Sequence, residues 1–418
     1  MNQPTTPTTH DLPHQPWPQD VAEVPYWVYS DPAVFALEQE RIFRGPTWNF
    51  VALEAELPNP FDWKATFVGE TPVVVARDGN GEVHVWVNRC AHRGALVCRE
   101  LRGNSQTHTC VYHQWAYDAS GALIGVPFRR GIGGKGGYPA DFDMAEHGTR
   151  QLRVARYKGL VFATFSDETP PLETYFGPDM LHWVDRVMVG PVEFLGTSRQ
   201  YIHSNWKLYT ENTKDPYHAS LLHLFHATFG VYRSSMGGGC TIGGEHRMHS
   251  ILRAWKIENE DIGEYKTGKI RTYDQGVTLA DPTLLDVHPE LEPVFTNHIQ
   301  SLFPSMVLQQ IHNTLAVRQI VPKGVDAFEL VFHFFGYADD TPELRAMRLK
   351  QANLVGPAGY ISMEDGEATQ LVQQGIVGAA DQHAYDALGG RGMDSTENLV
   401  DEALIRAFWR GYRGLMGF

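Results

Sequence analysis

The stretch Cys90–His113, "CAHRGALVCRELRGNSQTHTCVYH", decides how this chain is interpreted. It holds three of the chain's four cysteines and three of its histidines. Two pairs stand out: Cys90-x-His92 and, after a spacer of seventeen residues, Cys110-x-x-His113. Two short loops that each supply a cysteine and a histidine can together offer four ligands to a metal. The candidates are a zinc site, a redox-active dithiol and an iron–sulfur centre.

The distribution of the ligands favours the iron–sulfur centre. A structural zinc finger usually pairs cysteine with cysteine and histidine with histidine, whereas each loop here carries one of each. In a Rieske [2Fe–2S] centre, one iron takes two cysteines and the other takes two histidines. Loops that each give one ligand of either kind satisfy this arrangement directly. Neutral imidazoles in place of two thiolates also raise the reduction potential.

The other cysteines have no second ligand nearby in the sequence. Cys98 is expected in a turn away from both pairs, as a buried free thiol without a histidine partner. Cys240 follows "SSMGGG" and is expected to be a loop thiol. His108 lies in the spacer between the pairs and is expected to be exposed.

Composition excludes several classes of protein. The chain has 418 residues, 43% of them hydrophobic and 20% charged, which is typical of a globular protein with more than one core. Its net charge of −14 argues against nucleic acid and anionic membranes as partners. Neither a long apolar run nor a charged-then-apolar leader is apparent, so a cytoplasmic protein is expected.

The texture of the sequence predicts three segments. Residues 1–47 comprise a Pro- and Thr-rich arm, expected to be extended, and a helix that begins at Asp31. Residues 48–167 alternate short β-rich runs with Gly, Asn and Asp turns and predict an all-β domain. Residues 168–418 mix strands such as "TLAVRQIVPKG" with helices such as "TPELRAMRLKQANLVG" and "ENLVDEALIRAFWRGYRGLMG". The chain is therefore predicted to be α+β overall.

A second metal motif lies in "ENTKDPYHASLLHLFH". Two histidines plus one carboxylate form the facial triad of non-haem Fe(II) oxygenases. His218 and His223 are five residues apart, roughly 140° around an ideal helix, whereas His223 and His226 face one way more naturally. A helix broken at Pro216 would allow the first pair to converge. Residue spacing alone leaves the choice open.

The two motifs together resemble the large subunits of Rieske-type ring-hydroxylating oxygenases. The segments "CAHRGA", "CVYHQWAYD" and Glu-Asn-x-x-Asp-x-Tyr-His-x4-His, which starts at Glu211, carry the resemblance. It covers nearly the whole chain. It implies an N-terminal all-β Rieske [2Fe–2S] domain and a catalytic domain with an antiparallel sheet flanked by helices, of the helix-grip type. Trp115 would pack beside the cluster.

The resemblance also implies the ligands and their neighbours. The cluster would be held by Cys90, His92, Cys110 and His113. The mononuclear iron would be held by His218, His223 and Asp365, with Glu364 and Glu367 as rival acids in the same segment and His226 as a wall residue. Asp215 would link His218 to the cluster ligand His113 of a neighbouring subunit in a trimer, and Asn212 would contact substrate.

The similarity extends to enzymes of aromatic acids, namely terephthalate dioxygenases, salicylate 5-hydroxylases, and anthranilate and ortho-halobenzoate dioxygenases. Arg318, in the otherwise apolar "TLAVRQIV", falls on the family's carboxylate-binding position, and Arg suits a carboxylate through paired hydrogen bonds. A snorkelling or ion-paired strand arginine is the alternative. Leu399 stands where terephthalate-type enzymes look to carry a second cation, which favours an acid with one carboxylate.

The expected function is thus hydroxylation of a 2-substituted benzoate such as salicylate or anthranilate. It would use O2 and electrons from NADH delivered by a reductase, with or without a ferredoxin, in an α3β3 assembly with a small β subunit. Terephthalate dihydroxylation and a single-subunit Rieske monooxygenase or O-demethylase are the alternatives within this chemistry. A zinc-containing electron-transfer or structural protein is the alternative outside it.

Overall fold

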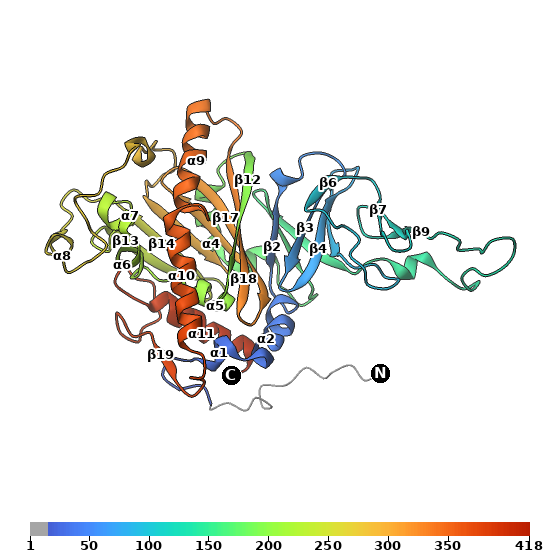
Figure 1. The fold of residues 1–418 in the computed structure, drawn as a ribbon, viewed down its shortest axis with the longest axis horizontal. Coiled ribbons are helices and arrows are strands. Elements are labelled where there is room, and N and C mark those ends of the chain that lie inside the picture. Colours follow the sequence, from blue (N-terminus) through green and yellow to red (C-terminus); the bar gives the residue numbers. More distant parts are fainter. Residues whose placement is uncertain (1–15) are drawn as a thin grey trace. The chain divides into compact units, whose positions relative to one another are not determined.

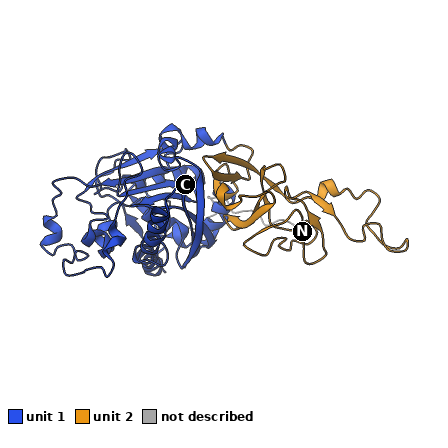
Figure 2. Ribbon diagram, turned by 90° about the horizontal axis from the view of Figure 1, so that it is seen from above, with its two compact units in different colours: residues 1–42, 170–418 blue, residues 43–169 orange. Residues whose placement is uncertain are grey.

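A computed structural model describes residues 16–418 of the chain, so most of the predicted N-terminal arm lies outside the described residues. Contacts divide the chain into two compact units (Figure 2). One comprises residues 43–169, and the other comprises 170–418 together with the described part of 1–42. Each unit has its own sheet and its own core.

The smaller unit is all-β, as its alternating runs and turn residues predict. Its larger sheet has the order β2-β11-β10-β5-β4-β3-β6, and a small sheet has the order β7-β8-β9. A turn at residues 78–82 joins β4 to β5, where the Asp78 side chain accepts hydrogen bonds from the backbone N–H groups of Asn80 and Glu82. The strands are β2 (Asn49–Leu53), β3 (Asp62–Val68), β4 (Thr71–Arg77), β5 (Val83–Val87), β6 (Arg102–Asn104), β7 (His108–Thr109), β8 (Ala116–Tyr117), β9 (Leu123–Gly125), β10 (Gln151–Tyr157) and β11 (Leu160–Thr164).

The larger unit is built on an antiparallel sheet of order β12-β18-β17-β16-β15-β14-β13. Consecutive strands from β13 to β18 are neighbours, so the sheet is a meander closed at one edge by β12. Its strands are β12 (Val192–Ile202), β13 (Gly237–Gly243), β14 (His249–Trp255), β15 (Asn297–Leu302), β16 (Met306–Ile311), β17 (Thr314–Gly324) and β18 (Ala327–Tyr337). A separate short pair joins β1 (Glu23–Pro25) to β19 (His383–Tyr385).

Helices cover this sheet, with α10 packed along α5 and against β12 (Figure 1). The Thr341 side chain accepts a hydrogen bond from Leu344 N–H and so caps α9, which the sequence predicts over this segment. The helices are α1 (Trp27–Ser30), α2 (Pro32–Glu38), α3 (Leu172–Phe176), α4 (Pro178–Val187), α5 (Trp206–Asn212), α6 (Ala219–Leu222), α7 (Leu224–Phe229), α8 (Gly263–Lys266), α9 (Pro342–Val355), α10 (Tyr360–Gly375) and α11 (Ala403–Met416).

Buried polar contacts attach the N-terminal helices to this unit. Glu38, at the end of α2, accepts a hydrogen bond from Trp206 Nε1 (2.8 Å) and pairs with Lys207 Nζ (2.6 Å). Tyr29 donates to Glu211 across 2.6 Å. Because these charged groups are paired inside the protein, α1 and α2 form part of the core around α5.

Two local expectations are wrong. The predicted C-terminal helix begins only at Ala403, because the side chain of Asn398 accepts Val400 N–H in a turn just before it. Leu399 therefore lies outside the helix, buried against the backbone of Gly238. Cys240 is a buried residue of β13 and not a loop thiol, since its strand pairs with β14.

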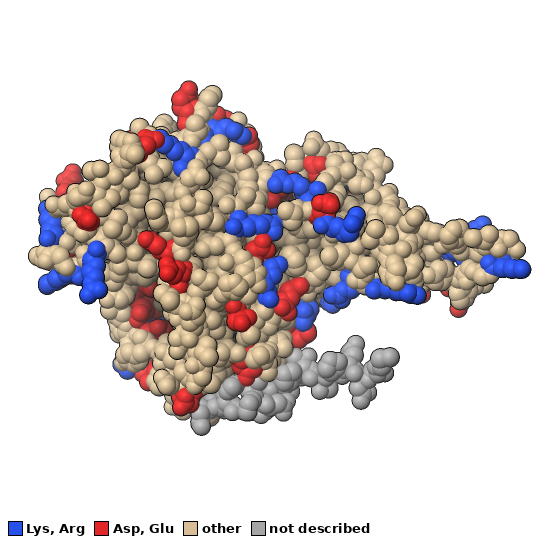
Figure 3. All heavy atoms as spheres, viewed as in Figure 1, with Lys and Arg blue, Asp and Glu red and all other residues tan. Residues whose placement is uncertain are grey.

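Within residues 16–418, every helix is too short or too polar to cross a membrane. Acidic and basic side chains are interspersed over the face shown in Figure 3.

Candidate functional site

The two Cys–His pairs of the smaller unit lie on loops with the same backbone geometry. In loop 90–95 the first residue donates its N–H to the carbonyl of the sixth (2.8 Å), and the fifth donates back to the first (2.8 Å). Loop 110–115 repeats both hydrogen bonds, each at 2.9 Å. The fifth residue is left-handed in both, with φ of 76° at Gly94 and 58° at Gln114. Each loop starts with its cysteine and carries its histidine at the tip.

The thiols of the pairs lie together inside the unit. Cys90 and Cys110 are 3% and 1% exposed, and their thiols lie close together without forming a disulfide. Burial raises the pKa of Cys110. The Tyr117 hydroxyl lies 3.2 Å from Cys90 Sγ and accepts the N–H of Ala91, which fixes the sulfur of the first loop.

The imidazoles of the two pairs, His92 and His113, are half-buried and lie closer to the surface than the thiols. The rings of His92 and His113 are 4.4 Å apart, and Trp115 stacks on His92 at 5.0 Å. Burial, and then the nearby His113, lower the pKa of His92, which keeps that imidazole neutral. Its Nδ1 is buried without a partner among the described residues. Paired thiols on one side and neutral imidazoles on the other fit a Rieske [2Fe–2S] cluster.

Two expectations for the spacer between the loops are wrong. His108 is buried, at 4% exposed, because it belongs to β7 and packs edge-on against Trp63 and Trp86. Its Nδ1 lies 3.3 Å from Cys98 Sγ, so Cys98 does have a histidine partner. Cys98 remains a buried thiol, and burial raises its pKa to about 12, so it carries no thiolate to offer a metal.

The second motif lies in the larger unit, where helix breaks resolve the spacing of its histidines. Helix α5 ends at Asn212, and α6 begins only after His218. His223 separates α6 from α7 with extended backbone angles (φ −94°, ψ 102°). His218 and His223 therefore do not lie on one continuous helix, and the centroids of their rings are 5.5 Å apart. His226, three residues on, lies 4.9 Å from the His223 ring.

Both imidazoles point their Nε2 atoms at one carboxylate of α10. Asp365 Oδ1 lies 3.4 Å from Nε2 of His218 and 3.2 Å from Nε2 of His223. His218, His223 and Asp365 each offer one ligand atom, and these three atoms lie within 4.8 Å of one another. The three residues could therefore hold one metal ion. Two imidazoles and one carboxylate fit a mononuclear Fe(II) site with open positions.

The charges of His218, His223 and Asp365 favour a bound cation. Burial acts to raise the pKa of Asp365, but the two histidines outweigh it and hold that pKa well below its ordinary value. Burial acts to lower the pKa of His218, but Asp215 and Asp365 raise it to about 10. The Asp365 carboxylate therefore stays ionised and needs positive charge beside it, which protons or a divalent metal can supply.

The outer nitrogens of both imidazoles are held by further carboxylates. Nδ1 of His218 lies 3.2 Å from Asp215 Oδ2, and Nδ1 of His223 lies 2.7 Å from Glu364 Oε2. Such contacts fix the orientation of metal-binding imidazoles. The sequence gives Glu364 only as a rival ligand, whereas the structure places it behind His223. Glu367 is exposed on α10.

Asp215 and Asn212 support the group from the turn between the helices. Asp215 Oδ1 accepts the N–H groups of Tyr217 (2.7 Å) and His218 (3.2 Å), so this side chain caps the turn as well as contacting the ring. Asn212 Nδ2 donates to Asp365 Oδ1 across 3.0 Å and lies 3.3 Å from His218 Nε2.

A cavity of about 50 Å³ adjoins this group. One water needs about 10–15 Å³ of such volume, so the cavity has room for more than a single water. The sheet forms its far wall, with α10 and the histidine segment opposite. It is lined by Asn212, Thr213, Asp215, His218, Ala219, His223, His226, Tyr232, Leu252, Asn297, Ile299, Ile311, Arg318, Ile361 and Asp365.

The guanidinium of Arg318, in β17, lines this cavity. It has no carboxylate partner among residues 16–418. It is 5% exposed, and it donates through Nε to Gln309 (2.6 Å) and through Nη1 to the Tyr209 hydroxyl (2.8 Å). By contrast, the buried Arg348 pairs with Asp340 (2.6 Å). A guanidinium buried without a counter-ion is unfavourable, so Arg318 is poised for an anion.

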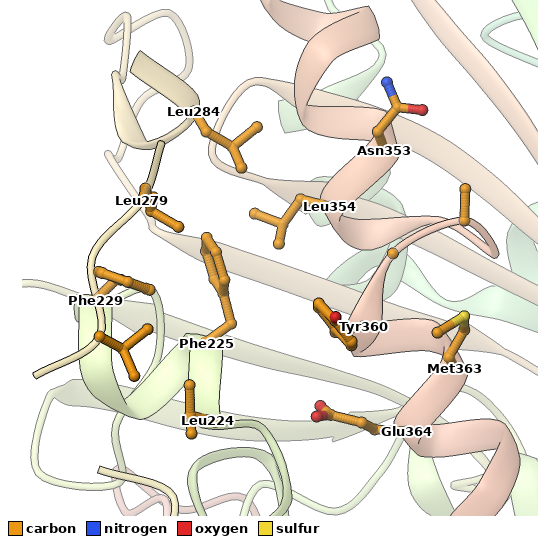
Figure 4. Close-up of a pocket in the computed structure, with 13 residues that line it drawn as sticks. Leu224, Phe225, Phe229, Leu279, Leu284, Asn353, Leu354, Tyr360, Met363 and Glu364 are labelled. Atoms are coloured by element: carbon orange, nitrogen blue, oxygen red, sulfur yellow. The ribbon is translucent and has the colours of Figure 1, made fainter. Parts of the chain in front are cut away.

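A second pocket, of about 740 Å³, is lined in part by Glu364 (Figure 4). Its wall is mostly apolar, with Phe225, Leu279, Leu284 and Leu354 facing one another. Glu364, the partner of His223, closes its lower edge in this view. The two pockets share no lining residue: Glu364 lines this one, and its partner His223 lines the first.

Comparison with known proteins identifies both units. Residues 47–135 match the Rieske [2Fe-2S] domain, and residues 182–417 match the ring hydroxylating alpha subunit (catalytic domain). The anthranilate 1,2-dioxygenase large subunit of Burkholderia cepacia is 58% identical over 96% of this chain and 94% of its own. A terephthalate 1,2-dioxygenase alpha subunit of Comamonas sp is 47% identical (94% and 95%), and the salicylate 5-hydroxylase large oxygenase component of Ralstonia sp is 40% identical (96% and 96%).

The fold has known counterparts as well. The naphthalene 1,2-dioxygenase of Rhodococcus sp., solved with indole bound, superposes with a TM-score of 0.78 at 23% identity and covers 94% of both chains. The expected combination of a β-rich Rieske domain and an antiparallel sheet flanked by helices is thereby confirmed.

The paired thiols make a prediction about the cysteines of the smaller unit. If Cys110 is a ligand, Cys110→Ser should abolish the visible absorbance and the acid-labile sulfide of the purified protein, because the cluster would lose a thiolate. Cys98→Ser is the matched control, since the thiol of this buried cysteine contacts His108 and belongs to neither Cys–His pair. Loss of the cluster in Cys98→Ser, or its retention in Cys110→Ser, would show that the ligand set is different.

The helix α10 provides a matched pair for the mononuclear site. Asp365→Ala should lower the iron content from about three to about two atoms per chain while the cluster absorbance stays intact. Glu367→Ala removes an exposed carboxylate two residues away and should leave the iron content unchanged. Equal iron contents in the two variants would exclude Asp365 as a ligand.

Proposed function

This chain belongs to the α subunits of the Rieske-type ring-hydroxylating oxygenases, as the large subunit of a terminal oxygenase, and on that premise we propose that it hydroxylates a benzoate with one carboxylate. Among 2-substituted benzoates, 2-aminobenzoate is the first substrate to test, because the anthranilate dioxygenase subunit shares 58% of its residues with this chain. Salicylate follows, with the salicylate hydroxylase at 40%.

Arg318 is the observation that carries this proposal. Its guanidinium lines the cavity beside the candidate iron ligands, and its Nη2 has no hydrogen-bond partner among the described residues. The hydrogen bonds to Gln309 and Tyr209 fix the plane of the group, and Phe332 covers it at 5.2 Å. An aromatic carboxylate would supply the missing counter-ion and be held in one orientation.

A second carboxylate would have no such partner. Of the described residues that line the cavity, Arg318 is the one Lys or Arg. Leu399 packs with apolar neighbours such as Leu252, one of the wall residues, and brings no charge. These observations support a monocarboxylate over terephthalate, although a terephthalate dioxygenase subunit is 47% identical to this chain.

The residues divide the chemical tasks between them. The cluster and the ferrous iron, when bound, would supply single electrons and the activation of O2. We assign Cys90, His92, Cys110 and His113 to hold the former, and His218, His223 and Asp365 to hold the latter. Asp215 and Glu364 then keep the two imidazoles turned toward the metal, and Arg318 sets the distance of the ring from it.

Assembly and electron supply belong to the same proposal. The smaller unit, predicted as 48–167, would serve as the electron-transfer domain, and 168–418 as the catalytic domain. We expect a small β subunit in an α3β3 complex, electrons from NADH through a reductase with or without a ferredoxin, and Asp215 hydrogen-bonded to His113 of the partner subunit. The cytoplasmic location stays a prediction. A chain that purifies and works without a small subunit would favour the single-subunit monooxygenase.

Arg318→Gln should lower kcat/KM for 2-aminobenzoate by roughly 10- to 100-fold, because it replaces a charge-assisted pair of hydrogen bonds with a neutral one. Its effect on the uncharged 2-aminobenzamide should be less than about threefold. Oxygen uptake and product analysis with a surrogate reductase measure both. Equal losses on the acid and the amide would mean that Arg318 is structural.

Asp215→Ala should reduce turnover to below about 1% of the wild-type rate, because the imidazole of His218 loses the carboxylate that fixes it. The cluster absorbance should be unchanged. Single-turnover measurements with a chemically pre-reduced enzyme separate electron supply from substrate binding. Normal steady-state turnover of Asp215→Ala would exclude the role given to this residue.

A further inference from the structure

Besides Arg318, the cavity wall carries polar side chains without hydrogen-bond partners among the described residues: the ring of His226 on the histidine segment and, on the sheet, Asn297. This residue begins β15, is 2% exposed and lines the cavity. Its Oδ1 is buried with no hydrogen-bond partner among the described residues. Resting on the proposed function, we infer that Asn297 is the specificity-determining residue that accepts a hydrogen bond from an amino group ortho to the substrate's carboxylate.

The surroundings of Asn297 call for such a partner. The neighbouring wall residues Leu252, Ile299 and Ile311 are apolar, and Ile311 lies directly opposite Asn297 in the β15–β16 ladder. A buried amide without a partner is unfavourable, since its hydration is lost and not replaced. An apolar residue at this position would complete the wall at no such cost, so the amide is explained by a ligand that hydrogen-bonds to it.

The sheet register places this amide and the cation of Arg318 at two ends of one wall. Asn297 lies opposite Ile311, and Arg318 lies opposite Val307 of the same central strand, β16. The two outer strands are about 10 Å apart, and four residues separate the positions by about 13 Å along β16. The long Arg318 side chain spans part of this diagonal. A single aromatic ring with polar groups on adjacent carbons can bridge the remainder.

The chemistry of the ortho group decides what Asn297 can recognise. In 2-aminobenzoate one N–H faces the molecule's own carboxylate, and the second is left for a protein acceptor. In 2-hydroxybenzoate the single O–H is taken by the carboxylate, and 2-chlorobenzoate has no donor. An acceptor at Asn297 therefore favours the amino compound over both. Rotation of the amide lets the oxygen meet the N–H without moving the strand.

Asn297→Leu tests this inference, because leucine has a similar size and no polar group. The values of kcat/KM for 2-aminobenzoate, 2-hydroxybenzoate and 2-chlorobenzoate are measured in the complete system of oxygenase and surrogate reductase. The variant should lose roughly tenfold on the amino compound and less than about twofold on the chloro compound. Ile299→Leu, in the same strand and the same wall, is the matched control and should leave the ratio of the two unchanged.

The outcomes separate the inference from the function on which it rests. If Asn297→Leu and the wild type show the same ratio of amino to chloro substrate, the inference is wrong and Asn297 is satisfied by a trapped water. If the wild type oxidises none of the three acids, the proposed function is wrong and takes the inference with it. Should Asn297→Leu lose the cluster absorbance, Asn297→Ala makes the same comparison without adding bulk.

Discussion

The catalytic unit depends on one buried carboxylate. Asp365 is 4% exposed, and two imidazoles direct their Nε2 atoms at one of its oxygens. Burying this charge would be prohibitive without positive charge beside it. The helix breaks at His218 and His223 allow both imidazoles to reach the Asp365 carboxylate. Asp215 and Glu364, behind the imidazoles, add two more carboxylates, so the site as a whole is built to retain a cation.

The opposite part of the cavity wall, where we propose that the substrate binds, has unpaired positive charge instead of excess negative charge. Across the cavity from Asp365, Arg318 is a buried cation without a carboxylate, and Asn297 adds a polar group without a partner. A metal at one wall and an aromatic acid at the other would balance both. This complementarity explains why the unit tolerates groups that would destabilise an ordinary core. On our proposal, the one cation among the described residues of this wall favours an acid with one carboxylate over a dicarboxylate.

Sequence and structure contribute differently to this account. The candidate cluster ligands could be proposed from the sequence because each Cys–His pair is local, and the candidate iron ligands His218 and His223 because a recognisable motif surrounds them. The structure brings these two histidines together with Asp365. The α+β class followed from the strand and helix patterns, and the finer architecture followed from the resemblance. Glu364 was not predicted as a support for His223, because an acid beside Asp365 looks like a rival ligand until the helix is oriented. Asn297 could not be found, since only the register of β15 with β16 places it in the cavity.

The most direct test is a crystal structure of the iron-loaded oxygenase soaked anaerobically with 2-aminobenzoate. The account predicts iron on His218, His223 and Asp365, the substrate's carboxylate within hydrogen-bonding distance of Arg318, and the carboxyl-bearing ring carbon or its neighbour facing the metal. A carboxylate bound to the iron, or turned away from Arg318 into the apolar pocket beside Glu364, would contradict it.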